Sequence, residues 1–174
     1  YHRYTWRIVH CDADWEPSDA LEIDYLDGFN DTVIEEWENS VNTNQLYTHY
    51  EFTIPNEDVS LKLSGNYRVE VFDDEEDGES PVAIFEFSVV EPLAALEAWV
   101  SGDTDISFND GQQQVSFAAS YPSIVSSPAS ELKAVVYQNG RRDNAVDGIV
   151  PTYVTGNKVE YVHNEKLIFD AGNE

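Results

Sequence analysis

The sequence predicts an all-β protein, and the spacing of its apolar residues carries this prediction. Short segments in which apolar and polar residues alternate recur along the chain, and turn-forming Gly, Pro, Asn and Asp separate them. A period of two over such short runs is typical of strands with one buried face. Only "NDTVIEEWENS" has a helical spacing, with Val33, Ile34 and Trp37 on one side. We expect one or two helical turns there, with Asn30 or Asp31 as the N-cap.

The expected strands follow one another in chain order. The first segment is rich in β-forming residues, and the others alternate. Asn139-Gly140 fits a two-residue hairpin turn, because both central residues of that turn need positive φ. Gly156-Asn157 lies in a similar position between "PTYV" and "KVEYV". The predicted strands cover residues 4–9, 46–54, 67–71, 85–89, 115–121 and 132–138.

The segment "LSGNYRVEVF" is more specific. A Tyr shortly after a Gly, at the start of an alternating strand, resembles the tyrosine corner of immunoglobulin-like sandwiches, in which the phenol bonds the upstream backbone. Tyr67 is then the corner residue. The sequence therefore predicts two tandem immunoglobulin- or fibronectin-like β-sandwich units, with the chain truncated at both ends. Residues 1–91 form the first unit, with a long loop insertion over 12–42, and residues 92–174 form an incomplete second unit.

Composition excludes several classes of partner. The 34 acidic residues against 9 basic ones give a net charge of −25, while 41% hydrophobic residues suffice for a real core. Nucleic-acid binding needs a basic face, and anionic lipid attracts basic segments. This acidic chain is therefore not expected to bind nucleic acid or anionic lipid. No apolar run approaches the length of a membrane span, so we expect no direct membrane insertion. The acidic surface mainly provides solubility.

The stretch "HCDADWEPSDALEIDYLDGFN" contains the only cysteine and decides whether the chain looks like an enzyme. A catalytic cysteine needs a nearby base and an electropositive setting. Cys11 has Asp12 and Asp14 beside it, and His10, as its neighbour in a strand, points to the opposite face. A buried structural cysteine at a strand end is the better interpretation. Asp12 and Asp14 are expected to cap local backbone N–H groups.

Metal sites are not supported by spacing. The four histidines show no i, i+4 pair and there is no second cysteine, so zinc is not expected. "DDEEDGESPVAI" places acidic residues at positions 1, 3 and 5 of an EF-like loop, with Gly78 at position 6. Position 12 is Ile84, where calcium requires a bidentate Glu. A solvated hairpin tip is therefore the preferred interpretation, and no metal or cofactor is expected.

Enzyme and sugar-binding alternatives remain open at this level. No nucleophile elbow, phosphate-binding loop or dinucleotide fingerprint occurs. Paired carboxylates for a hydrolase are possible in any chain so rich in acids. Trp15, Trp37 and Trp99 would suit the platform of a carbohydrate-binding module, although each is better explained as a core filler.

Several longer strings match a known family. "YTWRIVHCDADWEPSDALEIDYLDGFN", "NSVNTNQLYTHYEFTIPNED", "LSGNYRVEVF", "QNGRRDNAVDGIVPTYV" and "AGNE" occur in order and at familiar spacings. Together they resemble the type IX secretion system plug proteins of Bacteroidetes, and the resemblance spans nearly the whole chain. Members are longer at both ends, which implies that this chain is an N-terminal and middle fragment.

The resemblance implies a periplasmic protein associated with the outer membrane. Such a protein binds the translocon of that secretion system and closes the periplasmic opening of its large β-barrel pore when no cargo is engaged. The resemblance implies no catalysis and no cofactor, and it carries over no functional residues. Trp15 and Tyr25 are our partner-binding candidates, because aromatic loops on a rigid sandwich often form interfaces. The alternative function is a carbohydrate-binding β-sandwich module of a glycan-utilisation system.

Overall fold

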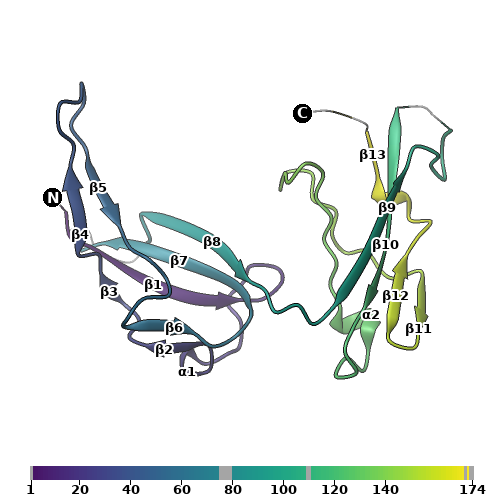
Figure 1. Ribbon diagram of the computed structural model, residues 1–174, viewed down its shortest axis with the longest axis horizontal. Coiled ribbons are helices and arrows are strands. Elements are labelled where there is room, and N and C mark those ends of the chain that lie inside the picture. Colours follow the sequence, from purple (N-terminus) through teal and green to yellow (C-terminus); the bar gives the residue numbers. More distant parts are fainter. Residues whose placement is uncertain (1, 75–79, 109–110, 171, 173–174) are drawn as a thin grey trace. The chain divides into compact units, whose positions relative to one another are not determined.

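The computed structural model describes residues 2–74, 80–108, 111–170 and 172. Contacts divide the chain into two units, Tyr1–Glu91 and Pro92–Glu174, called unit 1 and unit 2 below (Figure 1). The regular structure of both units is mainly antiparallel strands, so the all-β prediction is confirmed. The finer assignment to tandem immunoglobulin-like sandwiches stays a prediction. None of the helices in the described ranges is long and apolar enough to cross a membrane.

A four-stranded antiparallel sheet forms the centre of unit 1. Its strands, in spatial order, are β3 (Thr32–Val33), β1 (Tyr4–Cys11), β7 (Gly65–Asp73) and β8 (Ala83–Val89). β1 pairs with β7 along its whole length, from Tyr4 opposite Asp73 to Cys11 opposite Asn66. Alternate side chains on one face, including those of Trp6 and Ile8, are buried, as the period of two requires.

A second layer covers this buried face. It consists of α1 (Glu22–Tyr25), β2 (Leu26–Gly28) and β6 (Val59–Leu61), which lie along one side of the sheet (Figure 1). Tyr25, Leu26 and Val59 pack into the core with the sheet residues. Residues 12–42, predicted as a loop insertion, thus supply much of this layer. Elements of two to four residues are too short to show a readable period, which explains the difference.

The predicted helix over "NDTVIEEWENS" is wrong. The segment forms β3 and β4 (Glu36–Asn39) instead. Val33 pairs with Thr5 on β1, and the Ile34 N–H donates a hydrogen bond of 2.9 Å to the Tyr4 carbonyl oxygen. Pairing with the edge of β1 therefore stabilises this segment more than a helix would. The helical pattern has only three apolar residues, and short isolated helices are only marginally stable in water.

The side chain of Asn30, predicted as a helix cap, extends the β1 ladder. Its Oδ1 accepts a 2.7 Å hydrogen bond from the Ile8 N–H, and its Nδ2 donates a 3.0 Å bond to the Ile8 carbonyl oxygen. One amide side chain thus satisfies both backbone groups of Ile8 beyond the end of β3.

The tyrosine corner is confirmed. Tyr67 is fully buried, and its hydroxyl donates a 2.7 Å hydrogen bond to the carbonyl oxygen of Leu63, four residues upstream. Gly65 begins the strand at φ +141°, and a Cβ atom there would overlap the His10 ring. The "SGNY" pattern therefore combines a backbone that only glycine fits with a hydroxyl that fixes the strand crossover.

Unit 2 is built on one sheet of five strands. Its path is β11 (Tyr153–Thr155), β12 (Lys158–Tyr161), β10 (Gln112–Ser120) and β13 (Ile168–Asp170), and β9 (Ala95–Ser101) pairs with the other edge of β10. Phe117 stacks on Tyr161 at 4.5 Å, and Val159 and Leu167 are fully buried beside them. Two short helical turns, α2 (Pro128–Glu131) and η1 (Glu165–Leu167), complete the described elements.

The Gly156-Asn157 hairpin turn is confirmed, whereas Asn139-Gly140 forms a turn without a two-residue hairpin, because the bridge that flanks it joins Val136 to Val146. Asn139 and Gly140 have φ of 54° and 70°, as a type I′ turn requires. Gly156 and Asn157 join β11 to β12 as a two-residue loop. The strand predicted over residues 132–138 is reduced to an isolated bridge between Val136 and Val146.

Candidate functional site

A separate hairpin projects from unit 1, and most of its strand residues are exposed. β4 and β5 (Thr48–Glu51) pair only with each other in the described structure, and the hairpin extends away from the central sheet (Figure 1). The register places Glu36 opposite Glu51, Trp37 opposite Tyr50 and Glu38 opposite His49. Directly opposed residues share a face and successive residues alternate. The hairpin therefore has one acidic face and one aromatic face.

The aromatic face anchors the base of the hairpin. The Tyr50 hydroxyl donates a 2.9 Å hydrogen bond to the His2 carbonyl oxygen and accepts one of 2.8 Å from the His2 N–H. Its ring also meets Tyr4 edge-on, with ring centroids 4.9 Å apart. These contacts fix the base of an element that would otherwise be marginally stable as an isolated pair of strands.

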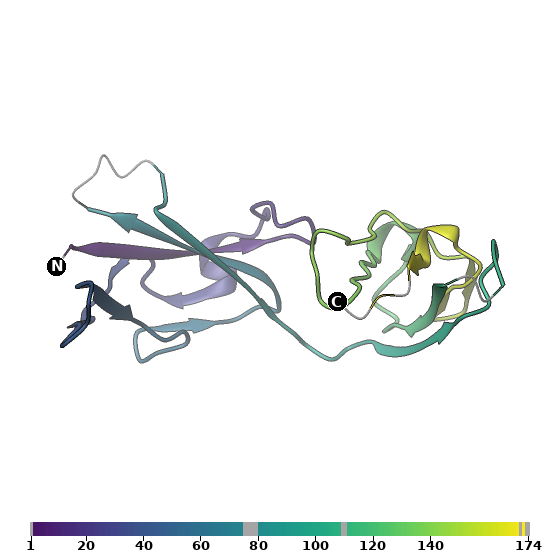
Figure 2. The same ribbon diagram turned by 90° about the horizontal axis from the view of Figure 1, so that it is seen from above.

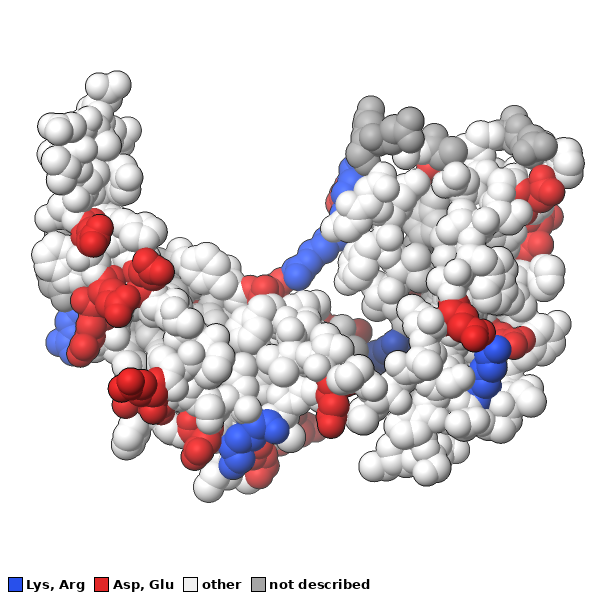
Figure 3. Space-filling model, in the orientation of Figure 1, with Lys and Arg blue, Asp and Glu red and all other residues white. Residues whose placement is uncertain are grey.

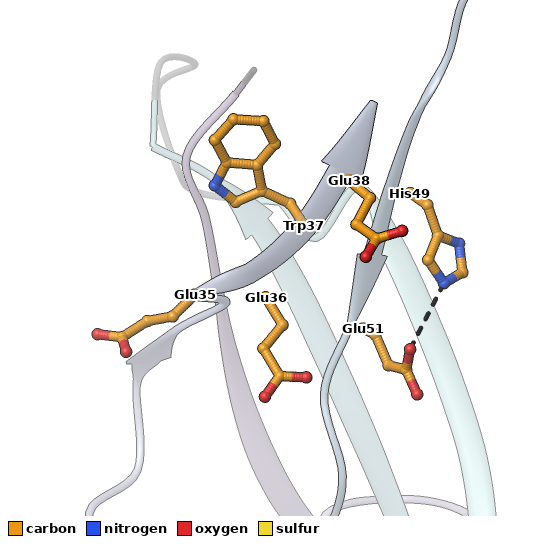
Figure 4. A pocket seen from close by; sticks show the side chains of 6 residues that line it. All are labelled: Glu35, Glu36, Trp37, Glu38, His49 and Glu51. Carbon is orange, nitrogen blue, oxygen red and sulfur yellow. Dashed lines mark ion pairs between the residues drawn. The ribbon is translucent and has the colours of Figure 1, made fainter. Parts of the chain in front are cut away.

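The acidic face forms an open hollow of about 510 Å³. It is lined by Glu35, Glu36, Trp37, Glu38, His49 and Glu51 (Figure 4). His49 and Glu51 form an ion pair of 3.8 Å, and both side chains are more than half exposed. Glu36 and Glu51 are like charges in directly opposed positions, which destabilises a strand pair. Charges at such an edge also prevent further strands from pairing with it.

The tip of the hairpin, residues 40–47, has the opposite character. It contains no charged residue, and Figure 3 shows carboxylates gathered towards the base of the hairpin and none at the tip. Val41, Leu46 and Tyr47 are 79%, 80% and 61% exposed. Large apolar side chains exposed at the end of a projecting element are a feature of interaction surfaces.

Hydrogen bonds order this tip in the free protein. Ser40 exchanges two with Tyr47: the Ser40 N–H donates to the Tyr47 carbonyl oxygen at 2.9 Å, and the Ser40 hydroxyl accepts from the Tyr47 N–H at 2.9 Å. The Thr43 hydroxyl closes the loop by donating to the Gln45 carbonyl oxygen at 2.8 Å. A tip that is ordered before binding loses less conformational entropy when it binds.

The structure separates the two residues predicted to bind a partner. Tyr25 lies in the core of unit 1, 7% exposed, and its hydroxyl donates to the Ile8 carbonyl oxygen at 3.3 Å. Burial raises the pKa of this phenol above its usual value. Trp15 is half-buried, at φ 64°, in a turn fixed by Asp12. The Asp12 carboxylate accepts from two backbone N–H groups, as predicted for an Asx turn.

Cys11 is a buried structural cysteine, as predicted. It is 1% exposed, and its thiol donates to the Val9 carbonyl oxygen at 3.7 Å. Burial raises the pKa of this thiol above its usual value, which disfavours the reactive thiolate.

Metal and sugar sites gain little support from the geometry. In the ranges that the structure describes, no three His, Cys, Asp or Glu residues are grouped so that they could hold a metal ion. The EF-like loop includes residues 75–79, which lie outside the described residues. Trp37 and Trp99 are 40% and 47% exposed, so their interpretation as core fillers is wrong. They belong to different units and form no single platform within one sheet.

The sequence analysis missed the hairpin tip as a candidate site. The available signal was the uncharged run from Asn39 to Thr48 in a chain with 34 acidic residues. Alternation predicted the second strand, but it did not indicate that the strand leaves the main sheet.

Comparisons with known proteins identify the family. No curated protein matches the chain. The chain is similar to a hypothetical protein from Parabacteroides merdae ATCC 43184 of known crystal structure, with 42% identity and a TM-score of 0.90. The match covers 100% of this chain and 44% of that one, so the chain spans less than half of its relative's length. Residues 1–91 match the family described as "Type 9 secretion system plug protein 1st domain". The chain therefore belongs to the type IX secretion system plug protein family.

Proposed function

We propose that this chain is a non-enzymatic binding protein that occludes an outer-membrane translocon of the type IX secretion system from the periplasmic side. The observation that carries this proposal is the match of unit 1 to the first domain of the plug family. The family supplies the role in type IX secretion, and the periplasmic location and the β-barrel partner are part of the proposal.

Surface chemistry supports binding rather than catalysis. The carboxylates of the β4–β5 hairpin line an open hollow at a solvent-exposed edge. General acid–base catalysis relies on groups held around an enclosed substrate, with water excluded. The hairpin tip instead offers an ordered and uncharged surface with three exposed apolar side chains. We propose that this tip contacts the translocon.

Occlusion requires a difference in affinity between two states of the partner. A plug shifts the pore towards the closed state only if it binds that state more tightly than the cargo-engaged state. An ordered hairpin satisfies this requirement when its receiving surface exists in only one of the two states. The acidic face beside the tip would then discourage binding to other acidic surfaces.

Affinity purification from the native envelope in mild detergent tests this function. The bait is the tagged full-length protein, and mass spectrometry identifies the partners. We expect an outer-membrane β-barrel of the secretion system to be recovered. Its absence from the wild-type sample would refute the proposed function.

Variants in the same experiment locate the contact. Val41→Asp combined with Leu46→Asp places charges on the tip and should remove the barrel from the sample. Ile124→Asp in unit 2 is the control, because Ile124 is equally exposed at 84%. Trp15→Ala tests whether Trp15, which the sequence predicted to bind a partner, contributes to the contact. Recovery of the barrel by the tip variant would exclude the tip as the contact but leave the plug function standing.

A further inference from the structure

β9 is a long, exposed edge strand of unit 2, with seven residues against three in the other exposed edge strand, β11. It pairs with β10 on one side only, within the described part of the chain, and runs along one margin of unit 2 (Figure 2). All seven of its residues are exposed. Its outer edge therefore presents backbone N–H and C=O groups to which another strand can bond.

Three apolar residues of β9, Leu96, Ala98 and Val100, lie on the core side of the sheet, while Trp99 lies on the opposite face. Leu96 lies opposite Ala119, and Val100 lies opposite Val115, in the β9–β10 register. These β10 residues pack against the core of unit 2, and opposed residues share a face of the sheet. Leu96 and Val100 nevertheless remain 67% and 59% exposed. The core face thus continues onto β9 without a covering layer.

β9 also lacks the protection that exposed edges usually carry. Its only charged residue, Glu97, projects from the opposite face and pairs with Lys158 at 3.4 Å. The β4–β5 hairpin, by contrast, carries carboxylates on both of its strands. Natural edge strands avoid association through charges, prolines or bulges. An apolar edge without them indicates that a partner strand belongs there.

We propose that β9 pairs with an amphipathic β-strand from polypeptide outside residues 1–174, which lays apolar side chains over Leu96 and Val100. Two observations favour this occupant. The matched family description is a first domain that ends at residue 91, so unit 2 belongs to a further part of the family's proteins. The P. merdae chain matches all of unit 2, yet this chain covers only 44% of it.

A second copy of the chain is a poorer occupant. Two copies would each bring a net charge of −25, and this repulsion opposes their association. A strand in the same polypeptide is present at a high effective concentration and carries no such additional charge cost from a second whole protein. The strand thus completes the core of unit 2 from within one chain.

Hydrogen–deuterium exchange tests this proposal without substitutions. The 174-residue chain is compared with the protein as its native gene encodes it. We expect the outward-facing amides of β9 to exchange at least about tenfold more slowly in the gene-encoded protein, at any protein concentration. Equal exchange in the two samples would overturn the proposal. Protection of β9 that appears in the 174-residue chain and is lost on dilution would assign the site to a second copy instead.

A pair of variants gives an independent readout. Leu96→Asp should leave the thermal midpoint of the 174-residue chain unchanged, because that side chain is exposed there. In the gene-encoded protein the same change should lower the midpoint by about 5 °C or more, because the carboxylate would be buried. Ile124→Asp is the matched control and should change neither. Equal effects of Leu96→Asp in both proteins would contradict the proposal.

Discussion

Single side chains complete the backbone hydrogen bonding of unit 1 where its short strands end. Ile8 is fully buried at the middle of β1, and β3 is too short to reach it. The Asn30 amide takes the place of a strand there, with one donor and one acceptor. A buried backbone group without a partner costs about 1–3 kcal/mol, so this residue matters more than its loop position indicates.

Replacement of Asn30 should therefore destabilise unit 1. We expect Asn30→Ala to lower the free energy of unfolding by about 1–3 kcal/mol, because the Ile8 N–H loses its side-chain acceptor and the Ile8 carbonyl oxygen keeps only the 3.3 Å bond from the Tyr25 hydroxyl. Urea denaturation followed by tryptophan fluorescence measures the change. Asn44→Ala at the exposed hairpin tip is the matched control and should lie within about 0.5 kcal/mol of the wild type. Equal stability of the two variants would show that water replaces the amide.

For single residues, the sequence predicted a role correctly where that role depends on neighbouring residues in the chain. Tyr67 was identifiable because the tyrosine corner has a local signature, and Cys11 because acidic neighbours disfavour a thiolate. Asn30 was misassigned as a helix cap. The same side chain suits a cap and a ladder extension, and only the distant partner Ile8 distinguishes them. Tyr25 was judged by its loop position, whereas its ring belongs to the core.

At the scale of elements, a polar cluster ties a loop of unit 2 to its central strand. The Asp105 carboxylate accepts a 2.6 Å hydrogen bond from the Gln114 side chain on β10 and lies 3.0 Å from His163 Nδ1. The Asp105 N–H donates to the Gln114 side-chain oxygen at 2.8 Å. The hydrogen bond from Gln114, and then that to His163, hold the pKa of Asp105 below its ordinary value of 3.8.

The lowered pKa of Asp105 gives a pH dependence of definite sign. A depressed carboxyl pKa contributes stability that is fully present above the ordinary value and is lost as pH falls through the lowered one. We expect Asp105→Asn to lower the thermal midpoint at pH 7 and the difference from the wild type to vanish by about pH 2–3. Asp147→Asn, at an exposed position of unit 2, should show no such dependence. A difference that grows as pH falls would contradict this assignment.

Predictions of elements succeeded where a turn or a long period fixed the local structure. The Gly-Asn turn and the long strands β1, β7 and β10 are of this kind. The helix prediction failed because hydrogen bonding to the edge of β1 stabilises Val33 and Ile34 more than one helical turn would. β9 was not among the predicted strands, because "ALEAWVS" does not alternate cleanly between apolar and polar residues.

At the scale of the whole molecule, acidity governs association. The net charge of −25 at pH 7 keeps copies apart, and the isoelectric point is about 4.1. Repulsion therefore weakens as the pH approaches that value, and the exposed edge of β9 is then less protected by charge.

We expect turbidity and the light-scattering mass to rise near pH 4.1 and to fall again at higher pH. Added salt at pH 7 should also raise the turbidity and the light-scattering mass, because it screens the repulsion between copies. Leu96→Lys on β9 should reduce the association near the isoelectric point more than Ile124→Lys does. A monomer at every pH would show that β9 is covered in solution.

Family membership was predictable from the sequence because it rests on long strings, such as "VHCDADWEPSDALEIDYLDGFN", rather than on single positions. The contact surface was not predictable from the sequence, because it depends on which strands leave the main sheet and which side chains remain exposed. That outcome is decided by packing between residues far apart in the chain, such as Tyr50 and His2.

The two hydrogen bonds between Tyr50 and His2 also have a mechanical consequence. They join the base of the hairpin to the start of β1, which is hydrogen-bonded along its length to β7. A force applied to the hairpin is therefore carried into the β1–β7 pair and shared by its ladder of hydrogen bonds. The base of the hairpin is thus mechanically coupled to the central sheet of unit 1.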